Sequence, residues 1–443
     1  MVTDTIAAIA TASGVGGVGI IRISGDMAIE ISNRVFSVSL SESHKMVLGR
    51  VIYNGQIIDE ALGCYFKAPH SYTGEDVVEL FCHGGTAVCK MVLEAVLANG
   101  ASMAGAGEFT RRAFLNGRLD LSQAEAVGDI ISAKTGDAVK IAANQLDGAL
   151  SNKISSLRSL LLGVSAHLLA TLDFSEEVDA IPYGELKNKV EAVHSELSEL
   201  LETADDGRII KDGINAAIIG AANVGKSSLL NAISGEDRAI VTDIEGTTRD
   251  VLEASVNIRG CRVNLLDTAG IRQSIDTVER LGIERSISAI ERADIILLVL
   301  DGSREKSEYD EPIIELIGNK KTICIINKAD LPRKLTPPLF ENTICISAKT
   351  GEGLDELFAL ISKMYSRGKL SSKIIIASER HKQSLLHADS HIKSALSAIS
   401  EGMPPDIILG DLELCLHSLG EVDGMTVSDE IIDNIFANFC VCK

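Results

Sequence analysis

The chain has 443 residues, 46% of them hydrophobic, only 8 prolines and a formal net charge of −20. This length predicts two or three folded domains, and the composition excludes a largely disordered chain. No run of 18 or more apolar residues predicts a membrane span, and the N-terminus lacks the basic start of a signal peptide, so we expect a cytoplasmic protein. The negative charge opposes non-specific attraction to nucleic acid, and the nine scattered cysteines predict neither a disulfide framework nor a zinc site.

Residues 1–116 are predicted to form a mixed α/β domain. Its expected elements are strands at 47–53 and 57–66 and a helix at 86–99 that ends at Gly100. Three charged residues in or just after this region are candidates for a ligand site: Arg22, Glu79 and Arg118. By pattern alone, ordinary surface charges flanking turns are an equally good interpretation.

Two separate segments, 117–210 and 375–443, are predicted to be helical, the second with helical stretches at 379–399 and 411–435. No proline occurs between Pro69 and Pro182, and apolar residues recur at three- and four-residue spacing. Amphipathic helices need partners that bury their apolar stripes. We therefore expect both segments to form one discontinuous bundle into which the middle of the chain is inserted, although two separate bundles are the alternative.

Residues 213–372 alternate apolar runs with helical stretches, which is typical of a doubly wound sheet. Strands are expected at 216–219, 263–266, 295–300, 322–326 and 343–346. The first of them leads directly into Gly220-Ala-Ala-Asn-Val-Gly225-Lys226-Ser227. Strand, glycine loop and helix in this order form a phosphate-binding loop, in which backbone N–H groups face an anion. A glycine turn before a core helix is the alternative.

Four further motifs follow at or between the ends of these strands. They are the loop Thr242-Asp243-Ile244-Glu245-Gly246-Thr247-Thr248, then Asp267-Thr268-Ala269-Gly270, then Asn327-Lys328-Ala-Asp330, and finally Ser347-Ala348-Lys349. A threonine of the first could bind Mg²⁺ opposite Ser227, and Asp267 could hold the water shell of the metal. Asp330 can accept two hydrogen bonds from the edge of guanine that adenine lacks. Together these motifs predict a guanine-nucleotide site that includes Asn223, Val224, Gly225, Lys226, Ser227 and Ser228.

The position after Gly270 also bears on catalysis. Ras-like switches place a glutamine there to orient the attacking water, whereas this chain has Ile271. Asn223 offers a carbonyl oxygen that could bind a monovalent cation beside the phosphates. Glu279 is a carboxylate near enough in sequence to reach the site, although from the residues alone an exposed acid at a helix start is the better interpretation.

The chain resembles the MnmE (TrmE) family of tRNA-modification GTPases along nearly its whole length. The resemblance rests on GGVGIIRISG, SYTGEDVVELFCHGG, GEFTRRAFLNGRLDLSQAEA, NVGKSSLLNAISG, AIVTDIEGTTRDV, LLDTAGIR, VERLGIERS and the terminal IFANFC with its final lysine. It implies a Ras-like P-loop domain inserted in a discontinuous helical bundle that follows an α+β folate-binding-like domain. It also implies GTP hydrolysis with Mg²⁺ on Ser227 and Thr248 and K⁺ on Asn223, Thr242, Ile244 and Thr247, with Glu279 positioning the water.

The same resemblance implies a second site and several partners. The N-terminal domain would dimerise and bind a tetrahydrofolate one-carbon donor through Arg22, Glu79, Arg118 and Lys443. The homodimer would join the FAD-dependent protein MnmG in a heterotetramer or larger complex. Together they would place a 5-carboxymethylaminomethyl (aminomethyl-type) group on the wobble uridine of certain tRNAs.

The C-terminal tail departs from the family pattern. The family has Cys-x-Gly-Lys, whereas this chain reads Cys440-Val441-Cys442-Lys443. A side chain in place of glycine restricts φ and could displace Lys443. Cys440 is a candidate tail thiol, and a structural cysteine is the alternative.

Two other functions are compatible with these motifs. One is a regulatory GTPase switch that acts in ribosome assembly without modifying tRNA. The other is a folate-dependent methyltransferase with a regulatory GTPase attached.

Overall fold

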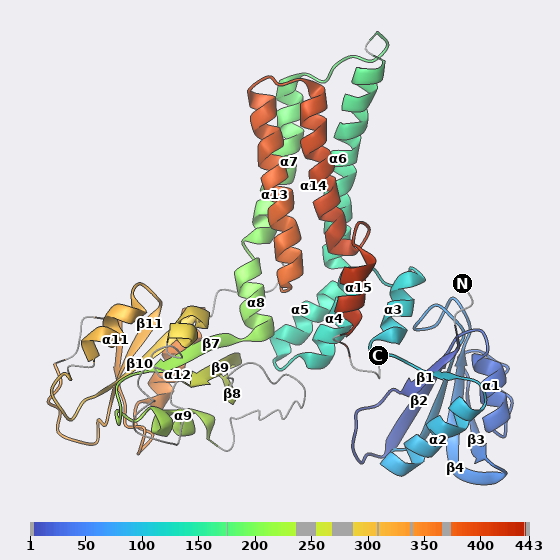
Figure 1. Cartoon of the computed structure of the whole chain (residues 1–443), viewed down its shortest axis with the longest axis horizontal. Coiled ribbons are helices and arrows are strands. Elements are labelled where there is room, and N and C mark those ends of the chain that lie inside the picture. The colour runs from blue at the N-terminus through green and yellow to red at the C-terminus, as the bar shows by residue number, and fades with distance from the viewer. Residues whose placement is uncertain are drawn as a thin grey trace. The chain divides into compact units, whose positions relative to one another are not determined.

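The computed structural model describes residues 4–174, 176–235, 254–267, 287–307, 310–336, 340–365, 374–437 and 439 (Figure 1). These residues belong to two compact units. The first comprises Met1–Ser132, Ala142–Glu199 and Arg380–Lys443, and the second comprises Ala133–Ile141 and Leu200–Glu379.

The first unit begins with a six-stranded sheet in the order β3-β4-β5-β2-β1-β6. Its described neighbours pair antiparallel apart from β1 and β6. Two helices contact the sheet, and their apolar side chains share a buried core with it. The elements are β1 (Ile6–Ile9), β2 (Val18–Ser24), α1 (Ala28–Val35), β3 (Met46–Tyr53), β4 (Gln56–Phe66), β5 (Val77–His83), α2 (Thr86–Ala98) and β6 (Ser102–Met103).

Helices follow the sheet in the same unit. They are α3 (Glu108–Leu115), α4 (Leu121–Ser132), α5 (Gly136–Leu146, which begins in the second unit), α6 (Ala149–Asp173), α7 (Tyr183–Leu201), α13 (Glu379–Ser400), α14 (Pro405–Asp423) and α15 (Asp429–Ala437). The long helices α6, α7, α13 and α14 run side by side as a bundle (Figure 1). Their buried residues recur every three or four positions, as in Ile154, Leu157 and Leu161 of α6. The bundle therefore combines segments from before and after the insert, as predicted.

The helix α6 is long and rich in apolar residues. Among the described residues it is the one helix long and apolar enough, by length and composition, to cross a membrane. Core helices of soluble proteins have the same composition, and α6 packs against α14. Its buried face of leucines, Ile154 and Val164 accounts for the apolar content on that side.

The second unit is built on a six-stranded sheet in the order β12-β11-β10-β7-β9-β8. All its pairings are parallel except that of β8 with β9. Its described elements are α8 (Ala204–Asp212), β7 (Ile214–Ile219), α9 (Lys226–Ser234), β8 (Ala254–Ile258), β9 (Cys261–Asp267), β10 (Ile295–Asp301), α11 (Asp310–Ile317), β11 (Thr322–Asn327), β12 (Asn342–Cys345) and α12 (Leu354–Tyr365).

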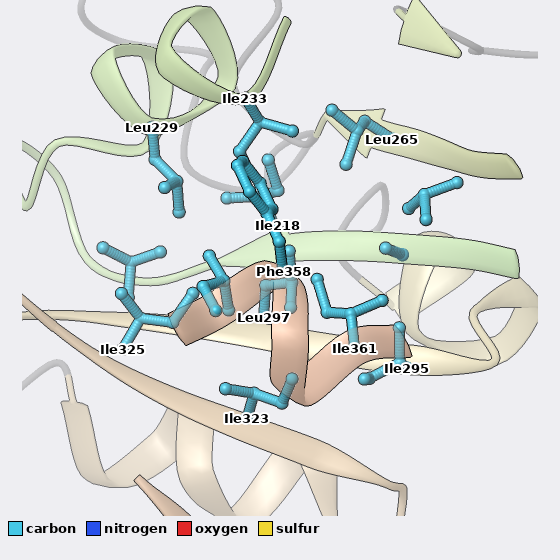
Figure 2. Packing of buried hydrophobic residues seen from close by; sticks show 14 of the residues in the cluster. Ile218, Leu229, Ile233, Leu265, Ile295, Leu297, Ile323, Ile325, Phe358 and Ile361 are labelled. Carbon is cyan, nitrogen blue, oxygen red and sulfur yellow. The ribbon is translucent and has the colours of Figure 1, made fainter. Parts of the chain in front are cut away.

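Apolar side chains cover both faces of this sheet. On one face, Leu229 and Ile233 of α9 and Phe358 of α12 point toward strand residues such as Ile218 and Leu297 (Figure 2). A second cluster on the other face includes Ile317 of α11. Every residue of the central strand β10 is buried, which explains why its sequence is continuously apolar rather than alternating.

The predicted fold class is confirmed: an α+β N-terminal part, a discontinuous helical bundle and an inserted α/β part with P-loop topology. Some elements differ from the predictions. The strand β8 has no predicted counterpart, because its short alternating pattern is weak. The single helical stretch predicted at 411–435 is two helices, because α14 begins at Pro405 and ends before Gly424, whose φ is +92°.

The chain segment that enters the second unit and the segment that leaves it lie against each other. A Cβ added to Gly207 of α8 would be 2.1 Å from the carbonyl oxygen of Ile376. The backbone N–H of Ile376 also donates to Thr203 Oγ1 at 3.1 Å. On the sheet side, Arg208 pairs with Asp294 at 2.5 Å, and Asp294 accepts a bond from Asn215 N at 2.9 Å. The entering and returning segments are therefore anchored to the base of the same sheet.

A buried ion cluster joins α4, α13 and α14 in the first unit. Arg380 donates to both carboxylate oxygens of Glu125, at 2.8 and 2.9 Å, and His381 Nε2 lies 2.7 Å from Glu125 Oε2. Arg380 also donates to the carbonyls of Glu421 and Val422. Burial raises the pKa of the Glu125 carboxyl, but His381 and Arg380 outweigh it and hold the pKa below its usual range.

Replacing Glu125 by glutamine should destabilise the first unit by about 3 kcal/mol, because Arg380 would be left buried without its counter-charge. The lowered pKa means that the stabilisation is complete above the unfolded value near 4.3 and declines as the pH falls below it. Urea unfolding of the full chain checks this. Glu196→Gln is the control, because its pair with Lys153 is half-exposed and should change stability by less than about 1 kcal/mol. Equal midpoint shifts in the two variants would contradict the argument.

Candidate functional site

The loop between β7 and α9 has the geometry of a phosphate cradle. Gly220 has φ +158°, and Gly225, which precedes the first helical residue, has φ +99°. Asn223 also adopts a positive φ of 62°, which is uncommon for a residue with a side chain. A Cβ at Gly225 would lie 2.2 Å from Asn327 Nδ2, so only glycine fits there. The loop therefore leads the backbone tightly into the N-terminus of α9, where N–H groups favour an anion.

Lys226 and Ser227 begin α9 at the mouth of this loop. The ammonium of Lys226 donates to the carbonyls of Gly220 and Ala221, both at 2.8 Å, so its side chain folds back over the loop. Ser227 lies in the first turn of the helix and is exposed to solvent. A hydroxyl oxygen in this position suits Mg²⁺, which prefers hard oxygen ligands.

Asn327, the last residue of β11, joins three segments that are far apart in sequence. Its side chain is buried; Nδ2 donates to Val224 O at 2.8 Å, and Oδ1 accepts a bond from Ala348 N at 3.0 Å. The strand order places β11 beside β10 and β10 beside β7, so these loops meet at the carboxyl edge of the sheet. The amide thus fixes the phosphate loop relative to the two predicted base-recognition segments.

Asp330 follows three residues later on an exposed turn. Its Oδ1 accepts a bond from Ser347 Oγ at 2.7 Å, and Ser347 is fully buried. Lys328, between Asn327 and Asp330, has a positive φ of 66°. Ala348 and Lys349 continue the segment after Ser347, and Lys349 is exposed. The structure therefore brings the Asn327–Asp330 and Ser347–Lys349 motifs together beside the phosphate loop.

Several predicted site residues lie outside the described residues. These are Thr242, Asp243, Ile244, Glu245, Gly246, Thr247, Thr248, Thr268, Ala269, Gly270 and Glu279, together with Cys440, Cys442 and Lys443 of the tail. The roles assigned to these residues stay predictions. The backbone of Asp267 is described: it ends β9 and pairs with Ile218, directly before the phosphate loop.

The N-terminal candidates Arg22 and Glu79 are direct neighbours on β2 and β5. Arg22 Nε donates to Glu79 Oε1 at 2.8 Å, and both side chains are largely buried. The guanidinium also lies over the rings of Tyr72 and Phe109, 4.8 and 5.5 Å from their centroids. Its Nη1 is among the described buried atoms without a hydrogen-bond partner, so the guanidinium retains a donor for a ligand.

Arg118 also lies near Tyr72. Its Nε donates to Ser71 O at 3.3 Å, and it lines a hollow of about 500 Å³ with His70, Ser71 and Tyr72. Burial raises the pKa of the Tyr72 hydroxyl, whereas its hydrogen bond to Thr110 and the charges of Arg22 and Arg118 act against the rise. Arg22 and Arg118 thus both act on Tyr72, and Glu79 is connected to them through its ion pair with Arg22.

The C-terminal segment also approaches this region. A Cβ at Gly107 would lie 2.8 Å from Phe436 O and 2.9 Å from Phe439 Cβ, and Gly107 directly precedes α3, the helix that carries Phe109. The rings of Phe436 and Phe439 are 5.4 Å apart. The last described residue of the tail therefore packs next to the helix that borders Arg22.

Three residues near the two sites were not predicted from the sequence: Tyr72, Phe109 and Asp301. Tyr72 and Phe109 lie inside motifs that were noted, but only the three-dimensional structure shows them stacked on Arg22. Asp301 is the last residue of β10, and β10 was the one predicted strand of the second unit whose end had no assigned role. An acidic residue at the carboxyl end of a parallel strand was the signal that could have identified it.

The doubly wound sheet, the glycine loop and the asparagine bridge define a P-loop protein of the guanine-nucleotide-binding class. Family comparison matches residues 121–440 to the MnmE helical domain and residues 5–118 to the GTP-binding protein TrmE N-terminus. The chain belongs to the MnmE (TrmE) family of tRNA-modification GTPases.

Full-length relatives support the same assignment. The chain is 45% identical over 457 residues to the tRNA modification GTPase MnmE of Clostridioides difficile (strain 630), covering 100% of both chains. It is 45% identical over 459 residues to the protein of that name from Alkaliphilus oremlandii (strain OhILAs), again covering 100% of both. Among solved structures, it is similar to an Era variant of Aquifex aeolicus bound to GDP and aluminium fluoride, with 29% identity, 40% of this chain and 66% of that chain covered, and a TM-score of 0.27.

Changing Asp330 to asparagine should weaken GDP binding at least tenfold, because two hydrogen bonds to a charged acceptor contribute about 1.5–3 kcal/mol each. Xanthosine diphosphate carries a carbonyl where guanine has its amino group, so it should bind the variant better than GDP does. Calorimetric titration of both nucleotides against both proteins measures this. Unchanged preference for GDP in the variant would show that Asp330 does not read the base.

Proposed function

We propose that this chain is a GTP hydrolase whose cycle drives formation of the 5-carboxymethylaminomethyl group on the wobble uridine of certain tRNAs. Its family membership supports the GTPase and the tRNA-modifying parts of this function. The observation that carries the GTPase part is the Asn327 bridge, because it orders a phosphate loop and a guanine-reading aspartate as one site. We further infer that the protein acts in the cytoplasm.

The nucleotide site contains residues suited to two cations. Ser227 and Thr248 would hold Mg²⁺, and Asn223, Thr242, Ile244 and Thr247 would hold K⁺. The accessible Ser227 hydroxyl and the positive φ of Asn223 at the loop mouth support this arrangement. Bound cations would supply positive charge to the transferring phosphoryl group.

The protein residues have separate tasks in this hydrolysis. Lys226 would exchange its bonds to Gly220 and Ala221 for phosphate oxygens. Asp330 would hold the guanine edge. Glu279 would orient the attacking water, because Ile271 stands where Ras-like switches have glutamine.

The N-terminal site would bind a tetrahydrofolate one-carbon donor. Arg22 and Arg118 offer charged donors, Glu79 a carboxylate acceptor and Tyr72 an aromatic face, which fit a flat, polar heterocycle with an acidic tail. The unpartnered Nη1 of Arg22 supports a ligand at this point. Lys443 would complete the pocket, and packing of Phe439 next to α3 supports its approach. The chain would act as a homodimer with the FAD-dependent MnmG and with tRNA.

Mass spectrometry of tRNA nucleosides tests the function in cells. Loss of this chain should abolish the aminomethyl-type modification of wobble uridine, and the wild-type gene should restore it. Complementation by Arg118→Gln should fail to restore it while the purified variant still hydrolyses GTP, because Arg118 belongs to the N-terminal site. Arg50→Gln, an exposed change on β3, is the matched control and should restore it. Unchanged wobble uridine in cells lacking the chain would favour a GTPase switch without a modifying role.

GTP turnover should be at least tenfold faster in KCl than in NaCl at equal ionic strength, because K⁺ would supply charge that an arginine finger supplies elsewhere. Steady-state phosphate release measures this rate. Glu279→Ala is the control: it should bind nucleotide normally and turn over slowly in both salts. Equal wild-type rates in the two salts would remove the K⁺ site from the proposal.

A further inference from the structure

A buried carboxylate outside the predicted motifs lies beside the nucleotide site. Asp301 is the last residue of the buried strand β10 and is paired in register with Asn327 of β11. Its side chain is only 5% exposed. An ionised carboxylate is seldom retained at such a position unless its charge is compensated. The partners of Asp301 therefore indicate what it does.

The principal partner of Asp301 is Lys328. The ammonium Nζ donates to Asp301 Oδ2 at 2.6 Å, and the Lys328 side chain is two-thirds buried. The other oxygen, Oδ1, accepts bonds from Ser303 N at 2.9 Å and Ser303 Oγ at 2.7 Å. Burial raises the pKa of Asp301, but the bonds from Lys328 and Ser303 outweigh it and leave the pKa below its usual range. Asp301 and Lys328 thus form an ion pair that joins the carboxyl ends of β10 and β11.

The backbone of Lys328 also has an uncommon conformation. Its φ of 66° lies in the left-handed region, which residues with a side chain adopt uncommonly. This conformation turns the chain between Asn327, which holds the phosphate loop, and Asp330, which is proposed to face the base. The turn is closed by a bond from Leu331 N to Lys328 O at 3.0 Å. Anchoring the Lys328 side chain therefore holds the turn that carries Asp330.

The loop of Asp301 is itself fixed against β11. Gly302 N donates to Asn327 O at 2.9 Å, and a Cβ at Gly302 would lie 2.8 Å from Ile326 Cγ2. The Gly302 carbonyl accepts bonds from Lys334 N and Leu335 N. Because the residue after Asp301 is bonded to both ends of the Asn327–Leu335 segment, the carboxylate is a rigid anchor rather than a mobile acid.

We propose that Asp301 is a positioning residue for guanine recognition, which holds the Lys328 ammonium and thereby presents Asp330 to the base. The inference rests on the proposed function, since it concerns the same nucleotide site. The hydrogen bonds of Asp301 go to Lys328 and Ser303, and Arg304 Nε lies 3.6 Å from Asp301 Oδ2; none of these three residues is proposed to hold the water or the cations. Its loss should therefore weaken base binding without slowing hydrolysis of bound GTP.

The first test measures GDP affinity by calorimetry and GTP turnover with the full chain. Asp301→Asn should weaken GDP binding about tenfold and raise the KM for GTP similarly, while kcat changes less than twofold. Asp310→Asn is the matched control, because Asp310 is equally buried in the same unit but begins α11. It should leave GDP affinity unchanged. A Kd for Asp301→Asn equal to wild type would overturn the proposal.

A double-mutant cycle shows whether Asp301 acts through Lys328. In a Lys328→Met background, which keeps the alkyl stem but lacks the ammonium, Asp301→Asn should cost less than twofold in GDP affinity. A tenfold cost in both backgrounds would mean that Asp301 only supports the fold, and the proposal would be wrong. Lys328→Met alone should weaken GDP binding about tenfold and Lys328→Arg should retain most of the affinity, so the proposal is testable even if Asp301→Asn does not fold.

Failure of the inference and failure of the proposed function give different results. If wild-type protein bound neither GDP nor GTP, the guanine-nucleotide function itself would be wrong. If wild type bound GDP but Lys328→Met and Asp301→Asn bound it equally well, the function would stand and the role of Asp301 would be rejected.

Discussion

The nucleotide site depends on one side-chain amide, that of Asn327. It is the donor to the phosphate loop at Val224 and the acceptor from the segment at Ala348, so a single planar group sets the distance between them. An aspartate of the same shape could not donate, and a hydrophobic residue could do neither. The close fit extends to Gly225, where any side chain would overlap the amide nitrogen. The close packing of Asn327 and Gly225 therefore limits which substitutions these two positions accept, even without bound nucleotide.

The N-terminal site depends on compensation of a buried positive charge. Arg22 is a largely buried cation, and its charge is compensated by Glu79 on the neighbouring strand and by two aromatic faces. Strand pairing fixes the first partner, because register places the two residues directly opposite each other. The aromatic partners come from a loop and from α3, which are separate in sequence. The site is thus assembled on a rigid sheet by segments that the rest of the first unit holds in place.

The sequence predicted most of this architecture because its signals are local. A glycine loop after an apolar strand and polar residues at strand ends identify the carboxyl edge of a parallel sheet wherever the flanking helices lie. Tyr72, Phe109 and Asp301 could not be predicted in the same way, since their roles depend on contacts between segments about 30 to 90 residues apart. The strand β8 was missed for a related reason: it is stabilised by pairing with β9 rather than by its own pattern. Contacts between distant segments can be identified only in a structure, whereas polar residues at strand ends can be identified from the sequence.

The close approach of Gly207 to Ile376 has a consequence for how the chain can fold. Seen from the first unit, residues 200–379 are a very long loop, and the entropic cost of closing a loop rises with the logarithm of its length. Here the inserted unit brings its own two ends together when it folds, because α8 and the returning segment are bonded to each other. The bundle then meets two ends that are already neighbours. Once folded, the insert acts as a short connection between the two halves of the bundle. If the insert folds first, α13 and α14 can therefore join α6 and α7 at little entropic cost.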